Sequence, residues 1–466
     1  MNFEDILVRL LNRRARPKRR MQSSGLLLGE SESLITRDHT PFVLPWSPVQ
    51  HAFISGRTGS GKTTVLLKIL YEHVRCGVPF LFIDFHGPAT DEILAMLASS
   101  SHTRPVILLE PWSNRTIGWN QLALNGESSY PIVQEIISVF HRRLWPDAWG
   151  PRLEEVLRMT LLALAQANLT LIEATTFLSR PEFRRAVLRR CSLPEVREFW
   201  TLRFERLSPS QRSLISETVL NKMSVFQDPT LRYLVGQQHG ALVFDAALAN
   251  GQTILCNLAS GRLRGNSYLL AALLVAAFKN AVYRRPPNAK PYSVVLDEFQ
   301  ECVAIESLDD FLRSFRKFNC ASYLATQQIS LSPELKASIF TNASNFISFA
   351  TSAADATFLG KEFGSSDGEL AAAMLPELKT GQAIAKVRGQ PARLLRVSPS
   401  PIAATPALIA AGRERCLQLG KSRGEIDEEI ARRTSDLLGA PDEAATKPKA
   451  RTAEFNDRTD LPEGYD

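Results

Sequence analysis

The amino-acid sequence predicts an α/β fold in which an all-helical insertion interrupts a mostly parallel sheet. Two observations lead to this prediction. Short apolar runs alternate with amphipathic helices both before and after residues 130–239, whereas strand-like runs are missing inside that block. Single strands that alternate with helices are typical of parallel sheets that helices cover on both faces.

The bulk composition is that of a globular protein. The chain has 466 residues, of which 44% are hydrophobic, and a formal net charge of +7. A length of about 150 residues per domain predicts two or three domains, and the positive charge weakly favours a polyanionic partner. The six cysteines form no CxxC pair, which indicates reduced thiols. No apolar run reaches the roughly 20 residues of a membrane span, so we expect a cytoplasmic protein, peripheral to a membrane complex if another subunit holds it there.

We expect five regions along the chain. They are a basic N-terminal arm (residues 1–28), the first part of the core (29–129), the all-helical insertion (130–239), the second part of the core (240–400) and a helical and disordered C-terminal tail (401–466). The arm contains the basic run Arg13–Arg20. This run is either a solvated terminus or a contact with nucleic acid or an anionic membrane surface.

The core elements follow from short buried runs and from helical periodicity. In the first part we expect strands at His51–Ser55, Pro79–Phe85 and Pro105–Leu109, and helices at Thr63–Arg75 and Thr90–Ala98. In the second part we expect strands at Thr253–Leu258, Tyr292–Leu296, Ala321–Ala325 and Phe346–Ala350, helices at Tyr268–Tyr283, Leu308–Phe318, Pro333–Phe340 and Ala353–Phe363, and a closing hairpin of Gln382–Val387 with Ala392–Val397.

The insertion is rich in arginine and has proline near the first turn of several expected helices, a position that proline favours. These helices are Pro131–Phe140, Pro151–Ala167, Pro181–Arg190 and Pro194–Arg206.

A glycine-rich loop follows the first core strand and matches G-x-x-x-x-G-K-[ST] at every fixed position. The glycines let backbone N–H groups turn toward phosphate oxygens, and the lysine supplies a point charge to the β- and γ-phosphates. The helix that follows directs its positive end at the same phosphates. The sequence therefore predicts an ATP-binding phosphate loop made of Gly56, Arg57, Thr58, Gly59, Ser60, Gly61, Lys62, Thr63 and Thr64.

Two adjacent carboxylates, Asp297 and Glu298, follow the buried strand Tyr292–Leu296. In an open α/β sheet, ligands bind at the carboxyl ends of the strands. We expect Asp297 and the hydroxyl of Thr63 to hold Mg²⁺, and Glu298 to orient and polarise the attacking water. The alternative is an exposed acidic pair at a strand end with no catalytic role.

Two further polar residues end core strands. We expect Asp84 beside the phosphate loop, where it positions a water or a metal ion; the alternative is that it caps the next helix or makes a loop hydrogen bond. Gln327 ends the strand after the acidic pair. It is placed either to contact the γ-phosphate and report its hydrolysis or to serve as an ordinary polar loop side chain.

The order of these motifs resembles the FtsK–HerA superfamily of hexameric DNA-pumping ATPases. The resemblance rests on the phosphate loop, then Asp84-Phe85-His86-Gly87, then Leu296-Asp297-Glu298, then Ala325-Thr326-Gln327, and it covers residues 25–400. Within the superfamily the chain looks closest to conjugative coupling proteins of type IV secretion and to HerA-type translocases. It lacks the N-terminal membrane helices usual in the first branch, and the stretch before its first core strand is short for the β-barrel of the second.

The resemblance implies a RecA-like core, a homohexameric ring with single- or double-stranded DNA in its channel, and an arginine that reaches the γ-phosphate of the neighbouring subunit. In this superfamily the arginine lies on the helix after the acidic pair, where Arg316 is the first candidate and Arg313 the second. An ATP-dependent DNA translocase is therefore the leading hypothesis. The alternative is a coupling-type ATPase that recruits a protein or nucleoprotein at the helical insertion, and an ordinary P-loop kinase or switch is disfavoured.

Overall fold

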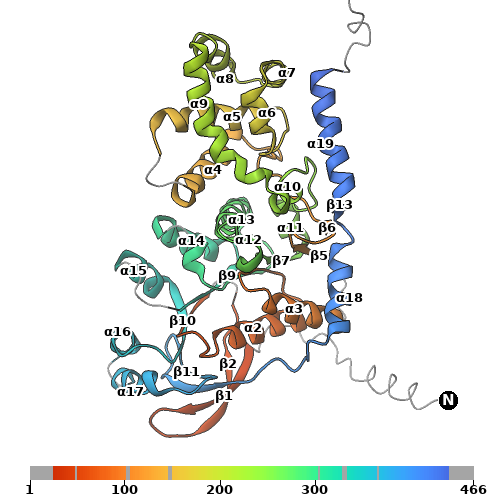
Figure 1. The fold of residues 1–466 in the computed structure, drawn as a ribbon. Coiled ribbons are helices and arrows are strands. Elements are labelled where there is room, and N and C mark those ends of the chain that lie inside the picture. The colour runs from red at the N-terminus through yellow and green to blue at the C-terminus, as the bar shows by residue number, and fades with distance from the viewer. Residues whose placement is uncertain are drawn as a thin grey trace, which may run out of the picture.

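The computed structural model describes residues 25–47, 50–100, 105–144, 149–302, 305–327, 333–364 and 367–439. The basic run Arg13–Arg20 and the end of the C-terminal tail lie outside these residues. Figure 1 shows a core built on one large sheet, with the helical insertion standing on one side of it. We call residues 129–235 of this insertion the helical lobe.

Within the described residues, the core sheet has 11 strands in the order β2-β1-β12-β11-β10-β3-β9-β8-β4-β7-β5. All neighbouring strands from β10 to β5 are parallel, and β11, β12, β1 and β2 extend one edge in antiparallel fashion. The strands are β1 (Leu26–Ser33), β2 (His39–Leu44), β3 (His51–Ser55), β4 (Phe80–Asp84), β5 (Val106–Leu109), β7 (Thr253–Asn257), β8 (Tyr292–Leu296), β9 (Cys320–Thr326), β10 (Ala343–Phe349), β11 (Gln382–Val387) and β12 (Arg393–Val397). The predicted α/β class with a mostly parallel sheet is confirmed.

Helices cover both faces of the sheet, because successive side chains of a strand point to opposite faces. On β3, Phe53 belongs to the apolar cluster that contains α13 and α14, whereas Ile54 belongs to the cluster that contains α2 and α3. The core helices are α2 (Lys62–Cys76), α3 (Pro88–Ser99), α11 (Phe244–Asn250), α12 (Ser260–Leu263), α13 (Asn266–Tyr283), α14 (Ile305–Lys317), α15 (Pro333–Asn342), α16 (Ala353–Phe363) and α17 (Gly368–Met374), with 3-10 turns η4 (Phe299–Glu301) and η5 (Leu375–Glu377).

The hairpin of β1 and β2 was not predicted. About half of the residues of β1 are buried, among them Leu26 and Leu28, and the second half of the strand, Glu30–Ser33, is polar. The strand takes its register from β12, with Gly29 opposite Val397. Since β1 begins at Leu26, it starts inside the range that the sequence assigned to the basic arm.

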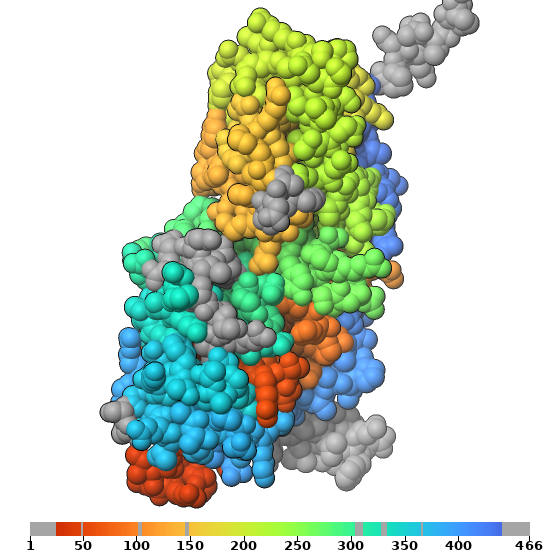
Figure 2. Space-filling view, turned by 60° about the vertical axis from the view of Figure 1, so that its left-hand side comes forward, coloured from red at the N-terminus to blue at the C-terminus, as the bar shows by residue number. Residues whose placement is uncertain are grey.

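The described part of the lobe contains only helices, as predicted. They are α4 (Ser129–Arg143), α5 (Pro151–Gln166), α6 (Glu173–Ser179), α7 (Pro181–Arg190), α8 (Pro194–Glu198), α9 (Pro209–Met223) and α10 (Pro229–Val235), with a π turn η2 (Phe199–Phe204) and a 3-10 turn η3 (Ser224–Gln227). The first apolar cluster runs from the core sheet into the lobe without a break, so the two are packed as one unit. Figure 2 shows the lobe, yellow to light green, rising directly from the core.

The chain after the hairpin returns along both parts. We call this segment the C-terminal strap: α18 (Pro406–Leu417), β13 (Lys421–Ser422) and α19 (Arg423–Leu438). In Figure 1 the strap, in blue, runs beside α3 and then along the lobe, and β13 pairs with β6 (Arg115–Thr116).

Two ion pairs fix the strap at its two ends. Arg413 of α18 reaches the buried Glu110 at the end of β5, with 3.1 Å between Nε and Oε2. Arg433 of α19 reaches Glu173 of α6 at 2.5 Å, and both of these side chains are buried. None of the helices in the described ranges combines the length and apolar character that a membrane-spanning helix needs.

Candidate nucleotide-binding and hydrolysis site

The phosphate loop joins β3 to the first turn of α2. Its glycines Gly56 and Gly61 have φ angles of 153° and 121°, which side chains rarely tolerate. A Cβ atom would lie 2.6 Å from the Cβ of Phe349 at Gly56, and 2.9 Å from its Cε1 at Gly61. The loop therefore needs glycine at both positions, because β10 packs directly against it. The N-terminus of α2 presents free N–H groups there, which is a ready anion site.

Lys62 is folded over the phosphate loop. Its Nζ donates to the carbonyl oxygen of Gly56 at 2.8 Å and lies 3.4 Å from that of Arg57. Burial lowers the pKa of Lys62, while the nearby carboxylates of Glu298 and Asp297 raise it. The two sequence motifs therefore meet within electrostatic reach of each other.

Asp297 is buried at the carboxyl end of β8, with 8% of its surface exposed. Its Oδ1 atom accepts no hydrogen bond from the described part of the chain. Burial, more than the neighbouring Glu298, raises the pKa of Asp297 to about 6, although Lys62 opposes this shift. A buried carboxylate oxygen without a partner, next to a phosphate loop, fits a ligand of Mg²⁺. Thr63, the second expected ligand, is exposed in the first turn of α2.

Glu298 and Gln327 lie together next to the loop. The Oε2 atom of Glu298 accepts a hydrogen bond from Nε2 of Gln300 at 2.7 Å and one from the backbone N–H of Gln327 at 3.4 Å. The side-chain oxygen of Gln327 in turn accepts from the hydroxyl of Thr58 at 2.7 Å. Gln327 therefore bridges the phosphate loop and the acidic pair, because β9 lies between β3 and β8 in the sheet.

Asp84 is not beside the phosphate loop, and that expectation was wrong. The strands β9 and β8 lie between β3 and β4, so Asp84 neighbours the acidic pair instead. Its Oδ1 accepts from the backbone N–H groups of His86 and Gly87, and its Oδ2 accepts from the backbone and hydroxyl of Thr90, all at 2.8–2.9 Å. The helix-capping alternative for Asp84 is therefore present, at the start of α3.

The two candidate trans-acting arginines differ in their surroundings. Arg316 is half-buried and donates to the carbonyl oxygen of Asn342 in α15. Burial lowers its pKa, and the nearby Arg388 lowers it further. Arg313, one turn earlier on α14, is exposed.

Gln300 and Arg143 were not assigned a role from the sequence. Gln300 stands two residues after Glu298 and contacts it, and Arg143 reaches the same turn from the lobe. A glutamine after an acidic pair carries no distinctive pattern. Arg143 lies in a different predicted region of the chain, so only the folded arrangement shows its contact.

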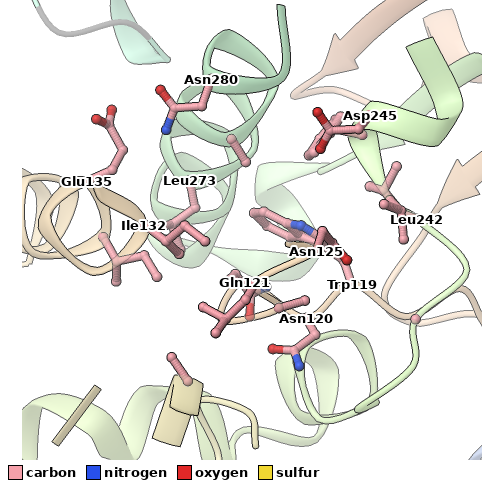
Figure 3. A pocket seen from close by; sticks show the side chains of 18 of the residues that line it. Trp119, Asn120, Gln121, Asn125, Ile132, Glu135, Leu242, Asp245, Leu273 and Asn280 are labelled. Atoms are coloured by element: carbon pink, nitrogen blue, oxygen red, sulfur yellow. The ribbon is translucent and has the colours of Figure 1, made fainter. Parts of the chain in front are cut away.

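A separate cavity of about 530 Å³ lies between the lobe and the core. Figure 3 shows side chains of α4 (Ile132, Glu135) and α13 (Leu273, Asn280) around it, together with Asn120 and Leu242 from other segments. No residue of the phosphate loop or the acidic pair lines it. This cavity is therefore distinct from the candidate nucleotide site.

Comparison with known proteins identifies structures with the same fold. No protein-family model and no curated protein sequence matches the chain. Among solved structures, the bacterial conjugative coupling protein TrwB is 15% identical, covers 85% of this chain and 93% of its own, and gives a TM-score of 0.55. VirB4 of Thermoanaerobacter pseudethanolicus is 14% identical, with 82% and 98% covered and a TM-score of 0.58. At these identities the likeness concerns the fold. The chain thus has the RecA-like α/β fold of the TrwB and VirB4 structures, as its resemblance to the FtsK–HerA superfamily implied.

Proposed function

We propose that this protein is an ATPase that binds ATP and Mg²⁺ at the Gly56–Thr64 loop and works as a ring-shaped DNA translocase. The observation that most supports the proposal is the convergence of four side chains: Asp297 and Glu298 from the end of β8, Gln327 from the end of the adjacent β9, and Lys62 from the first turn of α2. Structures of TrwB with ADP and Mg²⁺ and with a non-hydrolysable ATP analogue have the same fold.

Each side chain has a distinct task in this mechanism. Lys62 exchanges the loop carbonyls that it now contacts for phosphate oxygens of the nucleotide. Thr63 and Asp297 hold Mg²⁺, which neutralises charge on the phosphates when it is bound. Glu298 orients the attacking water and accepts its proton. Gln327 lies between the loop and Glu298, where loss of the γ-phosphate changes its contacts.

DNA, single- or double-stranded, is the proposed track, and a homohexamer is the proposed assembly. The net charge of +7 favours a polyanion, and the comparison structure TrwB is described as a conjugative coupling protein. In the ring, Arg316 or the exposed Arg313 stabilises charge on the γ-phosphate of the neighbouring subunit. Arg316 must first leave the carbonyl of Asn342. We place the ring in the cytoplasm, where other subunits can hold it at a membrane complex.

The test is steady-state ATP hydrolysis by the purified protein without DNA, with single-stranded DNA and with double-stranded DNA, at low and moderate salt. We expect turnover that Glu298→Gln abolishes while nucleotide binding persists. We also expect salt-sensitive stimulation by DNA, since phosphate contacts release counterions. Turnover at the parent rate in Glu298→Gln would refute the catalytic assignment.

The same measurement separates the second candidate function, a coupling-type ATPase for a protein or nucleoprotein substrate. Turnover that is indifferent to DNA would favour it, with the lobe as the docking surface. For the trans-acting arginine, Arg316→Ala and Lys62→Ala proteins are mixed. Restored activity at mixed interfaces is expected, and no recovery at any ratio would exclude Arg316 from this role.

A further inference from the structure

The turn that follows the acidic pair is supported from two sides. Glu298 has φ 53° and ψ 52°, a left-handed conformation that is unfavourable for residues other than glycine. Such a conformation persists only where its surroundings hold it. On the core side, Phe299 is fully buried, and its ring packs edge-on against Phe53 of β3, with 6.3 Å between centroids.

On the other side, the support comes from the lobe. Arg143 is the last residue of α4, and its Nη2 atom donates to the carbonyl oxygens of Glu301 at 2.6 Å and of Gln300 at 3.2 Å. Its Nη1 atom lies 3.5 Å from the carboxylate of Glu301. A guanidinium is a rigid fork with several donors, so it fixes the position of both carbonyls at once.

Gln300 connects this fork to the catalytic carboxylate. The guanidinium of Arg143 holds the main-chain carbonyl of Gln300. The side-chain Nε2 of Gln300 donates to Oε2 of Glu298 at 2.7 Å. We propose that Arg143 is a positioning residue for hydrolysis, which aligns Glu298 through Gln300 and thereby makes the lobe a part of the catalytic assembly. The inference rests on the proposed function, since it assumes that Glu298 orients the attacking water.

Because Arg143 is part of α4, its position depends on how α4 is attached to the core. Lys279 of α13 pairs with Glu135 of α4 at 3.1 Å, and both helices also contribute lining residues to the cavity of Figure 3. Atoms that line a cavity lack packing partners on that side. Any shift of α4 also moves Arg143 and the turn that it holds.

The test compares Arg143→Ala with Arg142→Ala. Arg142 is the adjacent, exposed arginine, which donates a hydrogen bond to Ser138 of its own helix. We expect Arg143→Ala to lower kcat about 10- to 100-fold, the scale of a misplaced catalytic group. ATP affinity, measured with a fluorescent analogue, should change less than about 2-fold, since the phosphate loop is untouched. Arg143→Lys keeps one donor and should recover part of kcat, and Arg142→Ala should match the parent.

A double-mutant cycle with Gln300→Ala tests the route itself, because this change keeps the main-chain carbonyl that Arg143 holds. If Arg143 acts through the Gln300 side chain, adding Arg143→Ala to Gln300→Ala should lower kcat little further. Fully additive losses would overturn the route, as would a parent-like kcat in Arg143→Ala. The positioning role would also be overturned if Arg143→Ala lost kcat and ATP affinity equally and had a lower urea midpoint. That result would indicate a merely structural role for Arg143.

The parent protein and Glu298→Gln distinguish the two proposals. If the parent hydrolyses ATP and Glu298→Gln does not, a neutral Arg143→Ala refutes only the positioning role. If the parent does not hydrolyse ATP, both proposals fall.

Discussion

Asp297 is expected to destabilise the metal-free protein at neutral pH, so Asp297→Asn should stabilise it. Burial raises the pKa of this carboxyl from 3.8 to about 6. Between pH 3.8 and about pH 6, Asp297 keeps its proton in the folded protein but has lost it in the unfolded chain. The stability from the neutral carboxyl is therefore complete below about pH 4 and is lost as pH rises through 6.

The size of the effect follows from the shift. The difference between a pKa of 3.8 in the unfolded chain and about 6 in the folded protein corresponds to roughly 3 kcal/mol of stability that is lost above pH 7. Asparagine has a similar shape and no charge. Its side-chain oxygen would replace Oδ1 of Asp297, which has no hydrogen-bond donor near it in the described part of the chain. Because an unsatisfied polar atom costs about 1 kcal/mol or more, we expect a net gain of about 1–2 kcal/mol at pH 8.

The assay is urea unfolding in EDTA at pH 8 and at pH 4, with Glu362→Gln as the control. Glu362 is exposed on α16, so this variant also exchanges one carboxylate for an amide. The gain of Asp297→Asn should appear at pH 8 and disappear at pH 4, while the control stays near the parent at both. A variant less stable than the parent at pH 8, or an equal difference at both pH values, would refute the argument.

Three other predictions concern single contacts. Lys62→Ala removes the charge that we propose binds the phosphates and should weaken binding of a fluorescent ATP analogue at least about 10-fold. Gly61→Ala places a Cβ atom against Phe349 at a φ of 121°. The urea midpoint of this variant should therefore fall by the equivalent of about 1–3 kcal/mol. The control is Gly150→Ala, whose Cβ meets open space and whose midpoint should stay near that of the parent. Arg433→Ala leaves its glutamate partner buried and should cost about 3–5 kcal/mol in the same assay, whereas the exposed Arg432→Ala should cost little.

The central strands could be predicted from the sequence because every residue in them is buried. The strand Tyr292–Leu296 has the bounds that its apolar run indicated, and the strand His51–Ser55 does as well. The hairpin of β1 and β2 could not be predicted in this way. Its residues Leu26–Ser33 are half polar and pair at the edge of the sheet, where the partner β12 rather than the local pattern determines the register.

The phosphate loop and the acidic pair could be predicted because each is a short local pattern with its own chemistry. The relative position of Asp84 could not, because chain order is not strand order. The strand β9 comes late in the sequence, yet it lies between β3 and β8 and brings Gln327 to the loop. Asp84 is displaced by the same arrangement toward Asp297.

The lobe is held to the core at more than one place, and this bears on how it can act. The strap fixes it through Arg433 and Glu173, and fixes itself to the sheet through Arg413 and Glu110. In Figure 1 the strap lies at one edge of the molecule, away from α14. Because the lobe is fastened along that edge, we expect it to make small rotations about the strap rather than wide swings. Small displacements suffice at Arg143, since a shift of about 1 Å at a catalytic group changes rates up to about 100-fold. The strap and Arg143 together therefore favour a lobe that adjusts the turn after Glu298 over one that opens and closes as a lid.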